Sequence, residues 1–203
     1  MNGRIHVSRP REAVVLLEID NPPSNALGGE VRRQLEAELD AIESDLAVRA
    51  VVLTGRGKGF CSGDDLREAA TRGEGAQASL GQFGRMLDKL EALRVPVIGA
   101  INGHAVGGGL ELSLCCDIRL AASEAKFLAA GVNVGLMASV HRLPRLVGTA
   151  AASICASRYM GRPLTAADQR RVAMQSPALL KLYAGFSQTS PLIAFILSLD
   201  KRR

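Results

Sequence analysis

The feature that most constrains the fold of this chain is an apolar run that passes through a glycine-rich turn into a segment carrying one carboxylate. The run extends from Val97 to Glu111 and contains three consecutive glycines, Gly107 to Gly109. Its first part predicts a buried strand, and residues 108–116 predict a helix. Glycines let a ligand approach the main chain, and free N–H groups at a helix start can bind an oxygen that gains negative charge. Glu111 would then serve as an acid or base, although a tight turn with a capping carboxylate explains the same residues.

Composition narrows the class of protein. A length of 203 residues fits one folding unit, and contents of 47% hydrophobic and 22% charged residues are those of an ordinary globular protein. The net charge of +5 is spread along the chain and aromatic residues make up only 3%, so we predict no nucleic-acid partner. A phosphate-bearing small molecule remains compatible with this charge.

The cysteines and the hydrophobic stretches predict an intracellular protein without a metal. Cys61, Cys115, Cys116 and Cys155 lack metal-ligand spacing and are expected to be reduced, buried thiols. Residues 1–10 have no signal-type apolar core, and the apolar run at 191–199 is too short to span a bilayer. We therefore expect a cytoplasmic location and no membrane partner.

Hydrophobic patterning predicts alternating strands and helices. The expected strands lie at 13–20, 50–54, 97–101, 118–121 and 125–128, and the expected helices at 29–46, 83–93 and 108–116. Residues 69–80 are rich in glycine, alanine and polar residues and are expected to form a mobile loop or a weak helix. The glycines at 55–59 match neither the P-loop nor the dinucleotide-binding spacing, so neither kind of nucleotide site is predicted.

Two ordered blocks of this sequence resemble the crotonase family of enoyl-CoA hydratases and isomerases. They comprise Val51–Gly55 with Phe60–Leu66, and Pro96–Leu112 with Cys116–Arg119, and the segment Asn21–Leu27 matches the first loop of that family. The resemblance implies an α/β fold, a spiral of β-β-α units followed by a C-terminal helical region. It places a crotonase-like core domain at 1–168 and a shortened, divergent helical segment at 169–203. Homotrimers or hexamers would be the assembled form.

The same resemblance implies where an acyl-CoA thioester would bind. The main-chain N–H groups of Asp64 and Gly108 would hold the thioester oxygen as it becomes an enolate, with the Asp64 carboxylate turned away from it. The positions that would follow the bound CoA are Ala26, Ser62, Asp64 and Leu66, and those that could meet its phosphates are Lys58 and Arg67. For these two cations a solvated surface charge explains the sequence equally well. CoA would be part of the substrate, and no separate cofactor is expected.

Glu111 matches one of the two catalytic glutamates of the hydratases, whereas Gly131 stands where the second is expected. Loss of one acid-base group typically costs about 10² to 10⁴ in rate. The resemblance thus implies a slow or altered hydratase, a relative that uses only Glu111, or an isomerase, and a non-catalytic acyl-CoA-binding or regulatory protein is the alternative. Within the motifs, His104 is expected to serve packing and Cys61 to be an inert apolar side chain.

Overall fold

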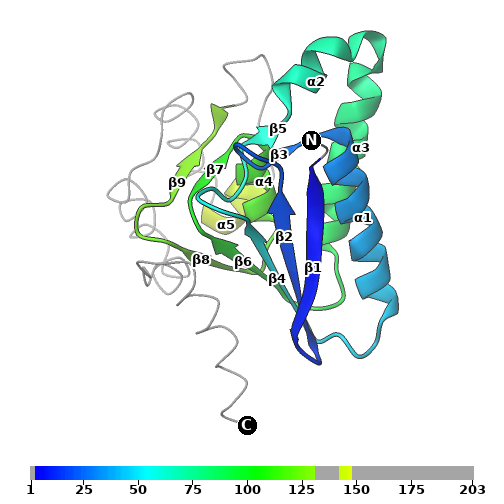
Figure 1. The fold of residues 1–203 in the computed structure, drawn as a ribbon, viewed down its shortest axis with the longest axis vertical. Coiled ribbons are helices and arrows are strands. Elements are labelled where there is room, and N and C mark those ends of the chain that lie inside the picture. Colours follow the sequence, from blue (N-terminus) through cyan, green and yellow to red (C-terminus); the bar gives the residue numbers. More distant parts are fainter. Residues whose placement is uncertain (1–2, 131–141, 148–203) are drawn as a thin grey trace.

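A computed structural model describes residues 3–130 and 142–147 of the chain. A five-stranded sheet forms its centre, with the strand order β1-β2-β4-β6-β8 (Figure 1). These strands are β1 (Arg4–Arg11), β2 (Val14–Asp20), β4 (Ala50–Gly55), β6 (Val97–Ile101) and β8 (Ile118–Ala121). β1 pairs with β2 in the antiparallel sense, and the other three pairings are parallel. The chain therefore has a mixed α/β fold built on a mostly parallel sheet.

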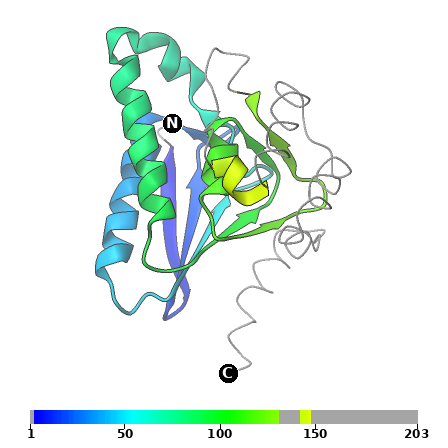
Figure 2. The same ribbon diagram turned by 180° about the vertical axis from the view of Figure 1, so that it is seen from behind.

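Two long helices cover one face of this sheet, as the two opposite views show (Figures 1 and 2). They are α1 (Gly29–Ser44) and α3 (Ala76–Glu91). The buried side chains of each helix fall on one face, as in an amphipathic helix: in α1 Val31, Arg32, Leu35, Leu39 and Ile42, and in α3 Met86, Leu87 and Leu90. In β2 the alternate residues Val15, Leu17 and Ile19 are buried, which is the period of a strand with one face on a core. The main core lies between the helices and this face.

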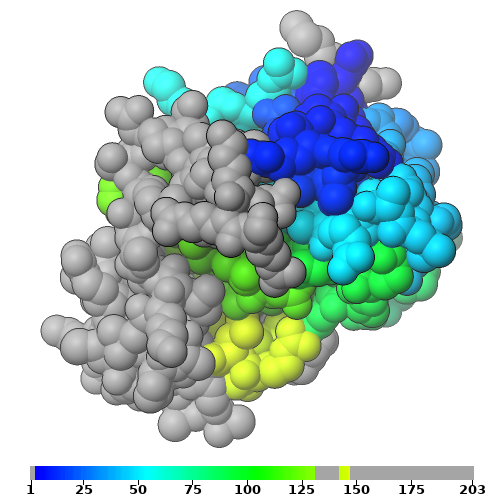
Figure 3. All heavy atoms as spheres, turned by 90° about the horizontal axis from the view of Figure 1, so that it is seen from below, coloured from blue at the N-terminus to red at the C-terminus, as the bar shows by residue number. Residues whose placement is uncertain are grey.

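A second layer is made of short elements around the glycine-rich turn. β3 (Ala26–Leu27) pairs with β5 (Gly63–Asp64), and β7 (His104–Val106) pairs with β9 (Lys126–Leu128). A single bridge between Cys61 and Ala105 joins the two small sheets. α4 (Gly108–Leu114) follows β7, and α5 (Arg142–Val147) lies against α4 at the surface (Figure 3). Segments that are far apart in the sequence therefore meet beside the start of α4.

The structure decides one open expectation about local structure and adds one strand. Of the two alternatives for residues 69–80, a loop or a helix, the structure has the helical one: they contain the end of α2 (Leu66–Thr71), the 3-10 turn η1 (Gly73–Gly75) and the start of α3. Asp65 initiates α2 because its carboxylate accepts hydrogen bonds from the N–H groups of Arg67 and Glu68. β1 was not predicted, since it is an edge strand with mostly exposed polar residues and lacks a long apolar run.

Several expectations fall partly or wholly outside the described residues. The core domain expected at 1–168 is described up to residue 130 and again at α5, and the segment 169–203 is not described. Gly131 and Cys155 also lie outside the described ranges. Within those ranges no helix combines the length and the apolar character needed to cross a bilayer.

Candidate functional site

The candidate site lies where β5 meets the turn between β7 and α4. Gly63 has a φ of +86°, and a Cβ atom placed on it would lie 2.6 Å from the nitrogen of Gly108 and 2.7 Å from the carbonyl oxygen of Val106. Gly107 also has a positive φ, +52°. Only glycine allows the two main-chain segments to approach so closely. The two residues expected to donate amides thus lie on adjoining backbone segments.

Main-chain hydrogen bonds fix this turn. The N–H of Val106 donates to the carbonyl of Cys61 at 2.9 Å, and the N–H of Gly107 donates to that of Leu128 at 2.8 Å. The N–H of Glu111 donates to the carbonyl of Gly107 at 3.1 Å and closes the first turn of α4. Gly108 is the first residue of α4, so its N–H has no partner within the helix. An amide in this position can bind an oxygen supplied by a ligand.

The carboxylate of Asp64 is bound by two arginines. Arg72, the residue that ends α2, donates from Nη1 to Oδ2 at 2.6 Å and from Nη2 to Oδ1 at 2.8 Å. Arg32 on α1 also donates to Oδ1. Hydrogen bonding to Asp64 raises the pKa of Arg72, which favours the charged form of this guanidinium. The side chain of Asp64 is therefore directed at α1 and at the end of α2.

Arg32 is the most deeply buried of these three charged residues. Its side chain is 1% exposed, compared with 12% for Asp64 and 13% for Arg72. Its guanidinium donates to the carbonyl of Ser79 at 3.3 Å and lies 4.7 Å from the centre of the Phe83 ring. Burial lowers the pKa of Arg32, and the charge of Asp64 opposes that change. Arg32 thus ties α1, α3 and β5 together.

Sequence reasoning missed Arg32, Arg72 and Glu68. Glu68 accepts a hydrogen bond from the N–H of Gly29 at 2.7 Å and so caps α1, whose N-cap residue Gly28 has no side chain to do so. A signal for Arg32 was present, because a charge at this position interrupts the buried stripe of the predicted helix at 29–46. For Arg72 and Glu68 the sequence carries no such signal, because neither residue falls within an apolar periodic pattern.

The positions expected to follow CoA come together around β3 and β5. Ala26 is in register with Gly63, and the N–H of Ser62 donates to the carbonyl of Ser24 at 3.1 Å. Leu66 begins α2, separated from β5 only by Asp65, and this residue is 57% exposed. These residues line one short stretch of surface.

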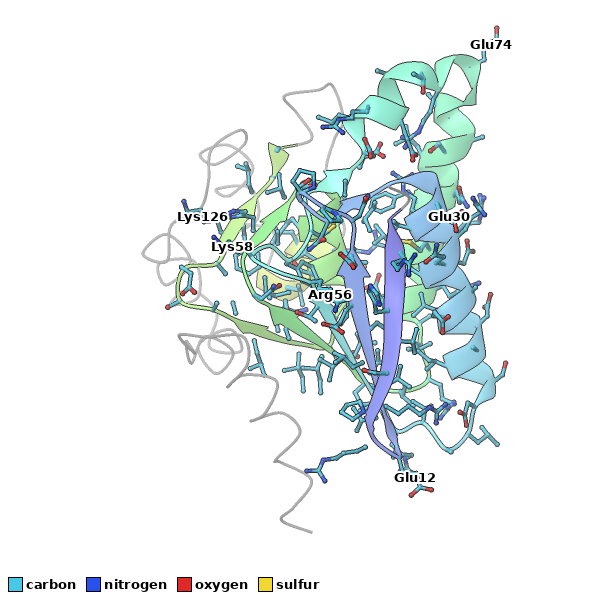
Figure 4. The ribbon with its side chains drawn as sticks, viewed as in Figure 1. Glu12, Glu30, Arg56, Lys58, Glu74 and Lys126 are labelled. Carbon is cyan, nitrogen blue, oxygen red and sulfur yellow. The ribbon has the colours of Figure 1, made fainter. Side chains whose placement is uncertain are left out.

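The two expected phosphate-binding cations are both at the surface. Lys58 is exposed in the loop after β4, on the side of the molecule away from α1 (Figure 4). Arg67 is exposed in the first turn of α2. Neither takes part in an ion pair within the described ranges, so both the phosphate-binding and the surface-charge interpretations stay open.

Glu111 lies in the first turn of α4, and its side chain is half-buried. Its main chain is fixed by the hydrogen bond to Gly107 and by accepting the N–H of Cys115 at 3.2 Å. The negative charge of Glu111 adds to the burial that raises the pKa of the Cys115 thiol. The carboxylate is thus carried on a rigid turn, three residues after Gly108.

The other sequence-based expectations for the motifs have mixed outcomes. Cys61 is fully buried, and burial raises the pKa of its thiol to about 12, as expected for an inert side chain. The side chain of His104 is exposed, so the expected packing role is not seen in the described part of the chain. Cys61, Cys115 and Cys116 are free thiols. Among the described residues, no cluster of metal-ligating side chains is present.

Comparisons with known proteins find relatives with similar sequences. A family model described as enoyl-CoA hydratase/isomerase matches residues 9–176. The chain is 40% identical over 144 residues to a probable enoyl-CoA hydratase of Bacillus subtilis, an alignment that covers 68% of this chain and 56% of that protein. It is 38% identical over 143 residues to a crotonyl-CoA hydratase of Syntrophomonas wolfei, covering 68% of this chain and 55% of that relative.

A solved structure resembles the fold as well. The structure of a probable enoyl-CoA hydratase/isomerase from Mycobacterium abscessus superposes with a TM-score of 0.79 and 35% identity, covering 98% of this chain and 74% of that one. The expected crotonase-like α/β fold is therefore confirmed. The chain spans only slightly more than half the length of the two curated relatives.

Proposed function

The chain belongs to the enoyl-CoA hydratase/isomerase family, and on that basis we propose that it hydrates 2-enoyl-CoA thioesters in fatty-acid metabolism. The main-chain amides of Asp64 and Gly108 form the oxyanion hole of this proposal. The observation that supports it most directly is the close approach of Gly63 to the nitrogen of Gly108, which brings the two expected donor segments together. CoA would lie along Ala26, Ser62, Asp64 and Leu66.

The reaction requires stabilisation of an enolate. As the oxygen of water bonds to the β-carbon, the electron pair of the C=C bond moves toward the carbonyl, and the thioester oxygen gains a negative charge. Two fixed amides stabilise this charge more in the transition state than in the substrate, and one such donor typically contributes about 10² to 10³ in rate. The Asp64 carboxylate does not oppose this, because it is directed at Arg32 and Arg72.

Glu111 is the proposed acid-base residue. Its carboxylate would take a proton from the attacking water, and delivery of a proton to the α-carbon would restore the carbonyl and complete the addition. With glycine at position 131, Glu111 would carry both proton transfers or share them with a group outside the described residues. The same single carboxylate could move a proton between two carbons, which keeps isomerisation within the proposal.

Substitution of Glu111 tests the catalytic proposal. We expect Glu111→Gln to lower the rate of crotonyl-CoA hydration by about 10² to 10⁴, because the amide cannot titrate near neutral pH. The rate is followed as the loss of enoyl absorbance, for crotonyl-CoA and for longer 2-enoyl thioesters. Equal rates for the parent and the variant would remove Glu111 from the mechanism.

A second candidate function is non-catalytic acyl-CoA binding, as a regulatory subunit for example. Gly131 favours it, because this residue provides no acid-base group where the family has its second glutamate. Calorimetry that detects acyl-CoA binding, together with no turnover across a panel of enoyl thioesters, would support this alternative. Absence of binding would count against both candidates.

A homotrimer or hexamer and a cytoplasmic location complete the proposal. The family resemblance supports the assembly. The three free, buried thiols Cys61, Cys115 and Cys116 fit a reducing compartment.

A further inference from the structure

A buried charge cluster lies directly behind the proposed oxyanion hole. We define the clamp as the Asp64 carboxylate with the guanidinium groups of Arg32 and Arg72. The clamp carries one negative and two positive charges, so its formal sum is +1. Because its three side chains are at most 13% exposed, water screens these charges weakly.

Other charged groups near the clamp are few. The nearest is Glu68, whose Oε2 lies 3.6 Å from Nη2 of Arg72 and also accepts the N–H of Gly29. Its side chain is 48% exposed, so water screens its charge more than it screens those of the clamp. Ser79, which accepts hydrogen bonds from Arg32, is neutral. The three members of the clamp are thus the least screened charges of this group, and Glu68 is the same in the parent and in each variant proposed below.

Two contacts connect the clamp with the amides. Asp64 belongs to it through its side chain and to the proposed oxyanion hole through its main chain. On the Gly108 side, a Cβ placed on that residue would lie 2.8 Å from Cζ of Phe83, whose ring lies 4.7 Å from the Arg32 guanidinium carbon. One aromatic ring therefore separates Gly108 from the clamp.

The carboxylate presents an electrostatic problem that the arginines resolve. A lone buried carboxylate on a donor residue would repel the developing enolate, whereas a cluster with a net positive charge attracts it. We propose that Arg32 and Arg72 are positioning residues that hold the Asp64 carboxylate and reverse the sign of the local charge, so that the oxyanion amides lie in a positive field. This inference rests on the proposed oxyanion roles of Asp64 and Gly108.

Arg72 also has a structural role, because it holds α2 in place. None of the residues of α2 is buried, so this helix lacks the apolar contacts that usually hold a helix in place. Arg72 ends α2 and connects it to Asp64, while Glu68 connects it to α1. A purely structural role for Arg72 is therefore the alternative to be tested.

Variants that change the formal charge of the clamp distinguish an electrostatic role of Arg72 from a structural one. The formal sum of the clamp is +1 in the parent, 0 in Arg72→Gln, +2 in Asp64→Asn, and again +1 in the double variant. If the field matters, kcat for crotonyl-CoA should fall about 10-fold or more in Arg72→Gln, rise in Asp64→Asn, and recover toward the parent in the double variant. A structural role predicts losses in both single variants and no recovery in the double variant.

A binding measurement provides a readout that does not depend on turnover. An aryl-substituted enoyl-CoA absorbs at longer wavelength when its carbonyl is polarised, so the shift on binding reports the field at the thioester oxygen. We expect the red shift to decrease in Arg72→Gln, to increase in Asp64→Asn, and to return toward that of the parent in the double variant. Unchanged shifts in all variants would overturn the inference.

The control is Arg33→Gln, which removes one positive charge from the neighbouring position of α1. Arg33 is 64% exposed and pairs only with Glu30 among the described residues, so kcat and the red shift should match those of the parent. If the parent protein itself binds no enoyl-CoA, the proposed function fails together with this inference. If the parent binds with a red shift but the double variant does not recover, this inference alone fails. If Arg72→Gln does not fold, Asp64→Asn still tests the inference, because the higher formal charge of its clamp should increase kcat and the red shift.

Discussion

Burial controls the chemistry of individual side chains in this protein, and the cysteines illustrate it most directly. Cys61 and Cys116 are almost completely buried, and burial raises the pKa of each thiol to about 12. In the unfolded chain a thiol ionises near pH 8.5. Between these values the folded state holds the proton and the unfolded state releases it. Stability is therefore expected to fall as the pH rises through this range.

The alkaline loss of stability can be assigned to one thiol by substitution. Each such cysteine contributes a decrease of up to about 1.4 kcal/mol per pH unit between its two pKa values. We expect Cys116→Ala to reduce the slope of unfolding free energy against pH, measured by urea denaturation from pH 8 to pH 11. The smaller side chain also lowers the unfolding free energy by an amount that does not depend on pH, and this amount does not affect the slope. Parallel slopes for parent and variant would show that Cys116 is not responsible.

The glycine-rich loop after β4 is held by the amide side chains of two buried asparagines. Asn102 donates from Nδ2 to the carbonyls of Gly55 at 2.7 Å and Gly57 at 2.9 Å. Asn25 donates in the same way to the carbonyls of Arg56 at 2.9 Å and Gly59 at 2.8 Å. This loop carries Lys58 and leads into β5, so two buried amides fix the approach to the candidate site.

Removal of one of these amides should destabilise the protein measurably. Asn102 is 6% exposed, so Asn102→Ala leaves two carbonyls without their donor and should cost about 1–3 kcal/mol of unfolding free energy. Asn102→Asp is the matched variant, because it keeps the shape but has no N–H to donate, and it should lose at least as much. Chemical denaturation measures both. A loss in Asn102→Ala below about 0.5 kcal/mol, the usual range of surface substitutions, would contradict this account.

At the scale of the whole molecule, the two faces of the central sheet differ. α1 and α3 cover one face, while the other holds Val14, Leu16, Ile98 and Leu120 around the buried Val52 and Ala100. These four side chains are only partly buried by the described residues. An apolar row of this kind is suited to further burial, either by the rest of the chain or by a second copy.

We expect sedimentation analysis to find a homotrimer, or a hexamer formed from two trimers, as the family resemblance implies. Assembly that buries apolar surface should persist at high salt, because the hydrophobic effect is not screened by ions. Measurements at several protein concentrations and two salt concentrations check both points. A species with the mass of one chain under all conditions would contradict the expected assembly.

The sequence by itself determined the order and type of the main elements, because their hydrophobic periods are local. It located the strands near 50–54, 97–101 and 118–121, and its glycine turn marked the segment that the structure brings against β5. Glu111 could be selected for the same reason, as a lone carboxylate after three glycines in a row.

Only the tertiary structure decided which charges meet. The clamp joins residues 32, 64 and 72, which come from α1, β5 and the end of α2, and no local pattern relates them. Their partnership arises because a buried carboxylate and a buried guanidinium are each unstable without an opposite charge, a condition that only the folded arrangement can satisfy. Local periodicity therefore predicted the elements, and long-range packing set the electrostatics of the candidate site.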